Sequence, residues 1–391
     1  MDFNGFYIIV LPFININKNP WKENCMADLA FLELHGSAFD RGLKHGQILK
    51  NAIASNLETY LARFNASGLS AEDARQEGKK WAEVISNQNP TYGKEIEGIA
   101  EGSKQSLSDI AMLNARYEIT FSLIKDEAAV IDSVDQTDGC TTFGALPQAT
   151  SNGHTILGQN WDWLIGVFGN CVLMRVKRDN GPDFICYTEA GIAGGKMGVN
   201  EHGIGLVENG LVSDHDGLNL YEKPFHVRCR EVLDAKTFDL AILPIVASRR
   251  VCSANFMVGH ADGEIINFET SPDAVSTLFP KEGLVTHSNH FLDPRHGPSQ
   301  MERLSPSTLY RANRLENLLR KDLGKLSIKE FQLALADHFG QPNAICRHPD
   351  PEQLKAKRTQ TNASIIIDLG TRTMHVADGN PCQNGFISYT L

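Results

Sequence analysis

The sequence lacks the excess of positive charge that nucleic-acid binding requires. Its 391 residues include 37 Lys and Arg against 47 Asp and Glu, which gives a formal net charge of −10 at pH 7. The basic residues form no cluster that could follow a phosphate backbone. Beyond the N-terminal region, no segment is long and apolar enough to span a bilayer. We therefore expect neither a nucleic acid nor a membrane as a partner, and a small molecule as the substrate.

Cysteine is present, but no two cysteines form a C-x-x-C motif. The eight are Cys25, Cys140, Cys171, Cys186, Cys229, Cys252, Cys346 and Cys382. Such scattered spacing resembles neither a disulfide framework nor a zinc ribbon, and it suits mostly buried thiols in a reducing cytosol. The sequence thus predicts a cytoplasmic protein.

The N-terminal region lacks two of the three marks of a signal peptide. Its apolar run "GFYIIVLPFINI" has the right length, but no Lys or Arg precedes it and no small-residue cleavage site follows it. We interpret residues 1–27 as an extension before a domain that begins near residue 28. The C-terminal "SYTL" carries no peroxisomal address.

The rest of the chain divides into two regions with different patterns. Residues 36–125 keep apolar residues at helical spacing, whereas apolar runs from residue 140 onward predict strands, many of them in hairpins. A helical insert at about 305–340 separates two hairpins, and Ser327 with Glu330 forms a capping box there. Helices, then antiparallel strands, then helices predict an α+β fold of stacked sheets with helices outside.

Cys140 differs from the other cysteines in its surroundings. A free thiol is more often a small buried hydrophobe than a nucleophile. However, Cys140 follows the polar "DQTDG", whereas Cys186 lies within the apolar strand pattern "FICYTEA". Gly139 provides the uncrowded carbonyl and the backbone freedom that attack by the thiol on the preceding peptide bond would need. Cleavage would leave an α-amino group, with a reference pKa of about 8, to accept the thiol proton.

A series of motifs in order carries a family resemblance. "DGCTT", "GQNWDW" and "YTEAGIAGGKMGVNEHGIGLVENGL" are followed by "VTHSNHF", "NRLENLL", "AICRH" and "IIIDLGTRTMHVADGNP". Over roughly residues 28–385 the series resembles the isopenicillin N acyltransferase family (acyl-CoA:6-aminopenicillanic acid acyltransferase-like, peptidase family C45) of N-terminal nucleophile hydrolases. The resemblance implies a four-layer αββα sandwich and a precursor that cuts itself between Gly139 and Cys140. Residues 28–139 and 140–391 would then form a small and a large chain that stay associated, because each supplies part of one core.

The resemblance also implies roles for other residues. Asp162 would orient the new amino group and stabilise its ammonium form, with a solvated strand-end aspartate as the alternative. Asn289 would help to hold the oxyanion. Asn209 would supply a further amide, although an Asn-Gly turn explains it almost as well, and Thr142 would bond the amino group or line the pocket. Arg358 falls where the family has an arginine, but its basic loop suits a solvated charge equally.

A zinc site formed by His287 and His290 is the competing interpretation of "THSNHF". Their i, i+3 spacing would suit two ligands, but no C-x-x-C or H-E-x-x-H partner accompanies them. We therefore expect no metal.

The expected reaction is acyl transfer from a small acylated amine. Cys140 would attack an amide or thioester carbonyl, and water or an amine would resolve the acyl-enzyme thioester. No cofactor is expected, and the resemblance allows acyl-CoA as a co-substrate. Within the family, hydrolysis of β-alanyl amides of biogenic amines is an alternative. Outside it, the sequence is compatible with a papain-type hydrolase that has an internal cysteine and a histidine base, and with an unprocessed, non-catalytic binding protein.

Overall fold

The computed structural model describes residues 29–130, 139–297 and 299–391. The extension predicted for residues 1–27 and the "DQTD" that precedes Gly139 lie outside the described residues. In the described part of the chain the strands form two sheets, which we call sheet A and sheet B.

Sheet A has eight strands in the described residues, in the order β1-β4-β5-β6-β7-β8-β9-β10. They are β1 (Ala30–Leu34), β4 (Cys171–Val176), β5 (Phe184–Glu189), β6 (Met197–Asn200), β7 (Ile204–Gly210), β8 (Ala254–His260), β9 (Glu264–Thr270) and β10 (Val275–Leu278). Strand β1 pairs with β4 in parallel, and the other neighbours are antiparallel. The β8–β9 hairpin turns at Asp262 and Gly263, where Gly263 has a φ of 95° that favours glycine.

Sheet B has six strands in the described residues, in the order β11-β2-β3-β12-β13-β14, all antiparallel. They are β11 (Leu284–His287), β2 (Gly139–Ala145), β3 (Ile156–Leu164), β12 (Thr359–Asp368), β13 (Thr373–Asp378) and β14 (Ile387–Thr390). Every residue of β2, β3 and β12 is buried. These strands therefore lie inside the molecule, covered on both faces.

The helices fall into groups along the chain. Before β2 come α1 (Ala38–Ile48), α2 (Lys50–Asn65), α3 (Ala71–Gln88), α4 (Pro90–Ser103), α5 (Leu107–Asn114) and α6 (Arg116–Val130). After β7 come α7 (Phe225–Leu233) and α8 (Phe238–Val246), and after β11 come α9 (Met301–Leu304), α10 (Thr308–Leu319) and α11 (Ile328–Leu335). The expected capping box of Ser327 and Glu330 begins α11.

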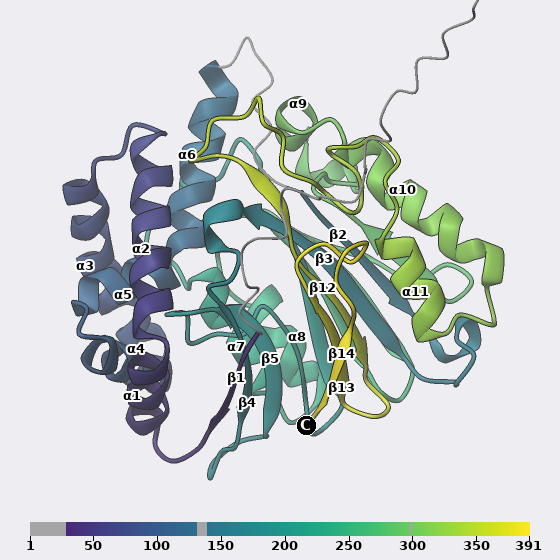
Figure 1. Cartoon of the computed structure of the whole chain (residues 1–391), viewed down its shortest axis with the longest axis horizontal. Helices are drawn as coiled ribbons and strands as arrows, with labels where there is room; N and C mark the ends of the chain where they lie inside the picture. The colour runs from purple at the N-terminus through teal and green to yellow at the C-terminus, as the bar shows by residue number, and fades with distance from the viewer. Residues whose placement is uncertain (1–28, 131–138, 298) are drawn as a thin grey trace, which may run out of the picture.

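The layers follow from which elements touch. Strand β7 of sheet A contacts β2 and β3 of sheet B, so the two sheets pack face to face. Helices α7 and α8 cover the outer face of sheet A, and α10 and α11 cover that of sheet B. Helices α1 to α5 gather at one side of the sandwich (Figure 1). The predicted α+β, four-layer αββα architecture is confirmed.

Candidate active site

Cys140 lies at the start of β2, between β11 and β3, and its side chain is buried. In the register of β2 with β3, Cys140 lies opposite Trp161, and Gly139 lies opposite Asp162. Residues directly opposite each other share a face of the sheet. The thiol therefore points to the same face as Trp161, and the carboxylate of Asp162 points to the other face, beneath Gly139.

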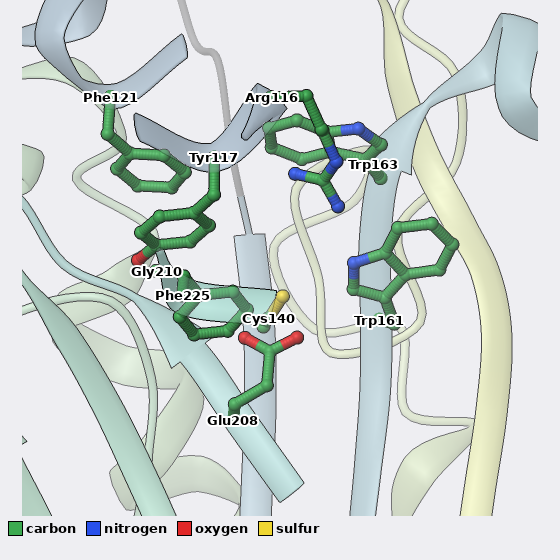
Figure 2. Close-up of a pocket in the computed structure, with 9 residues that line it drawn as sticks. All are labelled: Arg116, Tyr117, Phe121, Cys140, Trp161, Trp163, Glu208, Gly210 and Phe225. Atoms are coloured by element: carbon green, nitrogen blue, oxygen red, sulfur yellow. The ribbon is translucent and has the colours of Figure 1, made fainter. Parts of the chain in front are cut away.

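The thiol faces a pocket with aromatic walls (Figure 2). The residues lining it are Arg116, Tyr117, Phe121, Cys140, Trp161, Trp163, Glu208, Gly210 and Phe225. The ring of Tyr117 stacks on those of Phe121 and Phe225, with centroids 4.1 Å and 4.0 Å apart. The free volume is about 10 Å³, which is room for about one water molecule. In this state the pocket must widen before a substrate enters.

Asn289 holds the main-chain nitrogen of Cys140. Its Oδ1 accepts from the Cys140 N–H at 2.9 Å and from Nη2 of Arg311 at 2.6 Å. Because both of these partners are donors, the side-chain atom that faces them must be the amide oxygen. The amide nitrogen, Nδ2, points the other way and donates to the carbonyl of Gly210 at 3.0 Å. Arg311 also donates to the carbonyl of Cys140 and to Oγ1 of Thr141. One buried cation thus positions both the asparagine and the strand.

The carboxylate of Asp162 is held by two side chains. Its Oδ1 accepts from Oγ1 of Thr361 at 2.6 Å, and its Oδ2 lies 3.3 Å from Nε of Arg347. Arg347 also lies against Gly139: a Cβ built on that glycine would fall 2.3 Å from Nη2. Any larger residue at position 139 would displace the guanidinium, so close approach is a second reason for glycine there.

Thr142 and Asn209 meet between the sheets. Asn209 Nδ2 donates to Oγ1 of Thr142 at 2.8 Å and to Oδ1 of Asn255 at 2.7 Å. Asn209 lies on β7, paired with Asn255 of β8, and not in a reverse turn. Within the described structure its Oδ1 has no hydrogen-bond partner. Two residues after the nucleophile candidate, a polar link therefore joins sheet A to sheet B.

Arg358 is placed away from this cluster. It precedes β12, and its Nη2 donates to the carbonyls of Pro351 and Gln353 at 2.8 Å and 3.1 Å. The loop between α11 and β12 folds back and brings Arg347, and not Arg358, to Asp162. The structure thus does not place Arg358 with the other candidate site residues.

The two histidines of "THSNHF" have other partners. His287 Nε2 lies 2.7 Å from Oε1 of Glu269, and its Nδ1 lies 2.8 Å from the carbonyl of Ser288. His290 Nδ1 lies 3.0 Å from Oγ1 of Thr308. Both ring nitrogens of His287 are therefore engaged within the protein.

Sequence comparison identifies the family. A family model described as acyl-coenzyme A:6-aminopenicillanic acid acyl-transferase matches residues 149–383. The chain is 31% identical over 352 residues to the acyl-coenzyme A:6-aminopenicillanic-acid-acyltransferase 40 kDa form of Emericella nidulans, covering 88% of this chain and 91% of that protein. The chain belongs to the acyl-coenzyme A:6-aminopenicillanic acid acyltransferase family. The resemblance drawn from the ordered motifs is confirmed.

Several solved structures are distantly similar to this member of the acyltransferase family. The Caenorhabditis elegans ortholog of N-acylethanolamine-hydrolyzing acid amidase has a TM-score of 0.46 and 14% identity, covering 64% of this chain and all of that one. Penicillin V acylase from Agrobacterium tumefaciens has a TM-score of 0.41 and 12% identity, covering 61% and 83%. Among the described residues of this acyltransferase-family chain, no helix combines the length and hydropathy of a membrane span.

Sequence reasoning missed two arginines of the site, and each had left a signal. Arg311 lies on the buried side of α10 together with Thr308 and Leu315. A charged residue on the buried face of a helix was therefore the signal in the sequence. Arg347 lies within "AICRH", a motif that the acyltransferase-family resemblance already contained. A buried guanidinium requires partners, and here those partners are the site residues.

A buried group of charges supports the two tryptophans of the pocket. The guanidinium of Arg116 lies 4.7 Å from the Trp163 ring centroid, and Nζ of Lys196 lies 3.2 Å from that of Trp161. Both cations bond Oε1 of Glu189, Lys196 at 2.7 Å. Burial alone would raise the pKa of Glu189, but Arg116 and Lys196 outweigh it and lower that pKa to about 2.

Replacing Glu189 with glutamine should strongly destabilise the fold. The change leaves two buried cations without their carboxylate, which costs about 3–5 kcal/mol of unfolding free energy. Because the folded pKa lies below the ordinary glutamate value of about 4.3, the stabilisation is complete above that value and is lost as the pH falls toward 2. Urea unfolding of Glu189→Gln should therefore vary less with pH over this range than that of wild type.

The control is Glu97→Gln, which removes a partly exposed partner of Lys94. Such a pair contributes less than about 1 kcal/mol. Equal losses in both variants would show that the buried charges do not stabilise the fold.

Proposed function

We propose that the protein is a self-processing acyltransferase whose nucleophile is Cys140, freed as a new N-terminus by cleavage after Gly139. One observation carries the proposal: Asn289 bonds the Cys140 nitrogen at 2.9 Å, while the thiol of the same residue faces the aromatic pocket. That nitrogen is the atom that would become the catalytic amine. The intact chain thus already has a polar partner where an N-terminal base would need one.

The first step is attack of the Cys140 thiol on the carbonyl carbon of Gly139. The carbon–nitrogen bond breaks as a thioester forms, the nitrogen takes up the thiol proton, and water then hydrolyses the thioester to release the carboxylate of Gly139 and the thiol. Arg347 lies against this peptide, and its positive charge favours the negative oxygen that develops during attack. Asp162 holds the guanidinium in place.

The second step acts on the substrate. The free amine accepts the thiol proton, the sulfur attacks the acyl carbonyl, and the leaving group departs with the proton, which leaves the acyl group on the sulfur as a thioester. An amine or water then attacks this thioester, takes the acyl group, and gives a proton back to the thiolate. Asn289 retains its hold on the amine through Oδ1. Its Nδ2 can also donate to the oxyanion of the substrate, once it releases the carbonyl of Gly210. Holding the oxyanion is the role that the resemblance implied for Asn289. The hydrogen bond from Asn209 to Thr142 links β2 of sheet B to β7 of sheet A.

The pocket indicates the substrate class. Five aromatic side chains suit an apolar acyl group, and the family supports acyl-CoA as its donor. The carboxylate of Glu208 points into the same pocket (Figure 2). It suits a cationic amine acceptor, and it also favours the second candidate function, hydrolysis of β-alanyl amides, whose acyl group carries an ammonium.

The two chains would remain together after cleavage. One hydrophobic cluster contains residues from both sides of the cut, and side-chain bonds cross it, including those from Asn56 Nδ2 to the carbonyls of Asn170 and Ala190 at 3.1 Å and 3.0 Å. Cleavage of one peptide bond removes none of these contacts.

The test is the intact mass of the wild-type protein under denaturing conditions. Two chains that divide between Gly139 and Cys140 are expected. The processed protein should then release CoA from acyl-CoA thioesters when an amine acceptor is added, and β-alanyl amides should be tested beside them. A single full-length chain with amide hydrolysis would instead indicate an internal cysteine nucleophile. A single chain without activity that still binds acylated amines would indicate a binding protein.

A further inference from the structure

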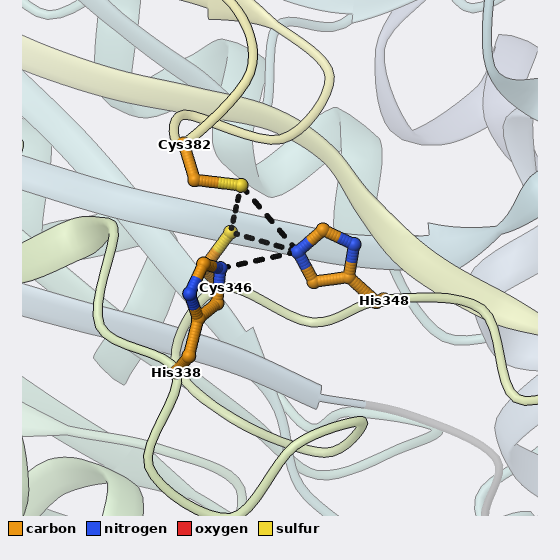
Figure 3. Close-up of side chains that lie close together, drawn as sticks. All are labelled: His338, Cys346, His348 and Cys382. Carbon is orange, nitrogen blue, oxygen red and sulfur yellow. Dashed lines mark hydrogen bonds between the residues drawn. The ribbon is translucent and has the colours of Figure 1, made fainter. Parts of the chain in front are cut away.

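Four side chains on the rim of sheet B point toward one another (Figure 3). They are His338, Cys346, His348 and Cys382, and one donor atom from each lies within 4.8 Å of all the others. His338 follows α11, Cys346 and His348 lie in the loop before β12, and Cys382 follows β13. Two loops, one between α11 and β12 and one between β13 and β14, therefore bring two sulfurs and two imidazole nitrogens to one point.

Four of the six donor-to-donor distances are close to those of a tetrahedral zinc site. Zn–S bonds of about 2.3 Å and Zn–N bonds of about 2.0–2.1 Å place two sulfurs about 3.8 Å apart, a sulfur and a nitrogen about 3.6 Å apart, and two nitrogens about 3.3 Å apart. The two Sγ atoms here are 3.6 Å apart, and His348 Nε2 lies 3.7 Å from Cys346 Sγ and 3.4 Å from Cys382 Sγ. His338 Nε2 and His348 Nε2 are 3.2 Å apart.

The backbone fixes the donors independently of any ion. Cys346 N–H donates to the carbonyl of Asp337, and His348 N–H to that of Pro342, both at 3.0 Å. Asn380 Nδ2 donates to the carbonyl of Arg347 at 2.7 Å and lies 3.5 Å from Cys346 Sγ. An N–H directed at a sulfur is the kind of outer-shell contact that supports a thiolate ligand.

We propose that these four side chains bind one zinc ion. Two thiolates and two neutral imidazoles form the Cys₂His₂ set that selects zinc, and the two thiolates neutralise its charge. Binding releases the two thiol protons. Because the protein supplies all four ligands, the ion is structural and activates no water. It ties together the segments after α11, before β12 and after β13.

The position of this ion bears on the proposed active site. Arg347 lies in sequence between two of the ligands, Cys346 and His348. Its own side chain extends to Asp162 and not to the four donor atoms. The zinc ion thereby holds the residue before Arg347 and the residue after it, and so fixes the backbone from which this guanidinium extends. The metal proposal itself does not depend on the proposed reaction, because metal content is measured without any substrate.

Metal analysis of the full-length, untagged protein tests the proposal. Wild type dialysed against zinc and then against metal-free buffer should retain about one zinc per chain. In Cys382→Ala, zinc affinity measured by competition with a chromophoric chelator should fall by more than the roughly 10–100-fold that loss of an outer-shell partner costs. Cys382 is exposed, so the variant should fold. The control Cys186→Ala, which removes a buried thiol elsewhere, should keep its zinc.

Two further measurements separate zinc from a disulfide. Cobalt in place of zinc should give the visible absorption of tetrahedral cobalt thiolate in wild type and not in Cys382→Ala. A chelator should lower the melting temperature of wild type alone, because the ion binds only the folded state. A Cys346–Cys382 disulfide in protein prepared under reducing conditions, or equal zinc in wild type and Cys382→Ala, would overturn the proposal.

Discussion

Replacing Cys140 with alanine is expected to leave one full-length chain and to abolish acyl transfer. The side chain supplies the atom that attacks both the Gly139 carbonyl and the substrate, so no neighbouring group can substitute for it. Activity should fall by at least about 10⁴-fold, as it does when a nucleophile is removed from other acyl-transfer sites. Intact mass and CoA release report the two effects separately.

Cys140→Ser and Cys186→Ala provide the comparison. Serine keeps a weaker nucleophile in the same place, so cleavage should be slowed and not eliminated. Cys186 is a buried thiol on β5, and its loss should leave processing intact. If Cys140→Ala still separates into two chains at the same bond, the nucleophile lies elsewhere and the proposed function fails.

Replacing Arg347 with alanine should have the second-largest effect on the reaction. Its guanidinium pairs with the fully buried carboxylate of Asp162 and lies against Gly139. Removing it leaves a void beside the peptide to be cut and withdraws the ion-pair partner of Asp162. Displacement of reacting groups by about 1 Å costs about 100-fold in rate, and we expect at least that loss in the rate of self-cleavage.

Arg358→Ala is the matched control, because Arg358 is an arginine of the same loop that is only partly buried and bonds main-chain carbonyls outside the cluster. It should process at a rate close to that of wild type. Circular dichroism melts of both variants distinguish a loss of stability from a loss of chemistry. The opposite result, slow processing in Arg358→Ala and normal processing in Arg347→Ala, would favour Arg358, the arginine assigned from sequence.

Local signals in the sequence predicted local structure well. The capping box at Ser327 fixes the start of α11 because its hydrogen bonds join residues two or three apart. Asp262 and Gly263 before β9 fix a turn because glycine adopts a positive φ there. The parallel pairing of β1 with β4 was beyond such reasoning. It joins Ala30 to Val172, and no periodicity within either segment records which strand will be its neighbour.

The residues of the candidate site also divide into those that local motifs indicate and those that only the folded structure brings together. Cys140, Asp162 and Asn289 were identifiable because each lies in a distinctive motif on or beside a strand. Arg358 was chosen by counting through an irregular loop, where distance along the chain says little about distance in space. The zinc ligands escaped notice for a related reason: the spacing between Cys346 and Cys382 matches no metal motif, and only the folding of two loops over sheet B brings them together.

The position of β2 between two paired neighbours has a consequence for the processed enzyme. A newly made chain end ordinarily frays, because nothing holds its first residues. Here the first residue would belong to a strand held by β3 along its full length and by β11 from Thr142 onward. The nucleophile would therefore inherit the rigidity of the sheet interior. A terminus created by cleavage would be as well ordered as a side chain in the core. It would not have to regain its position at each turnover, as a mobile chain end would.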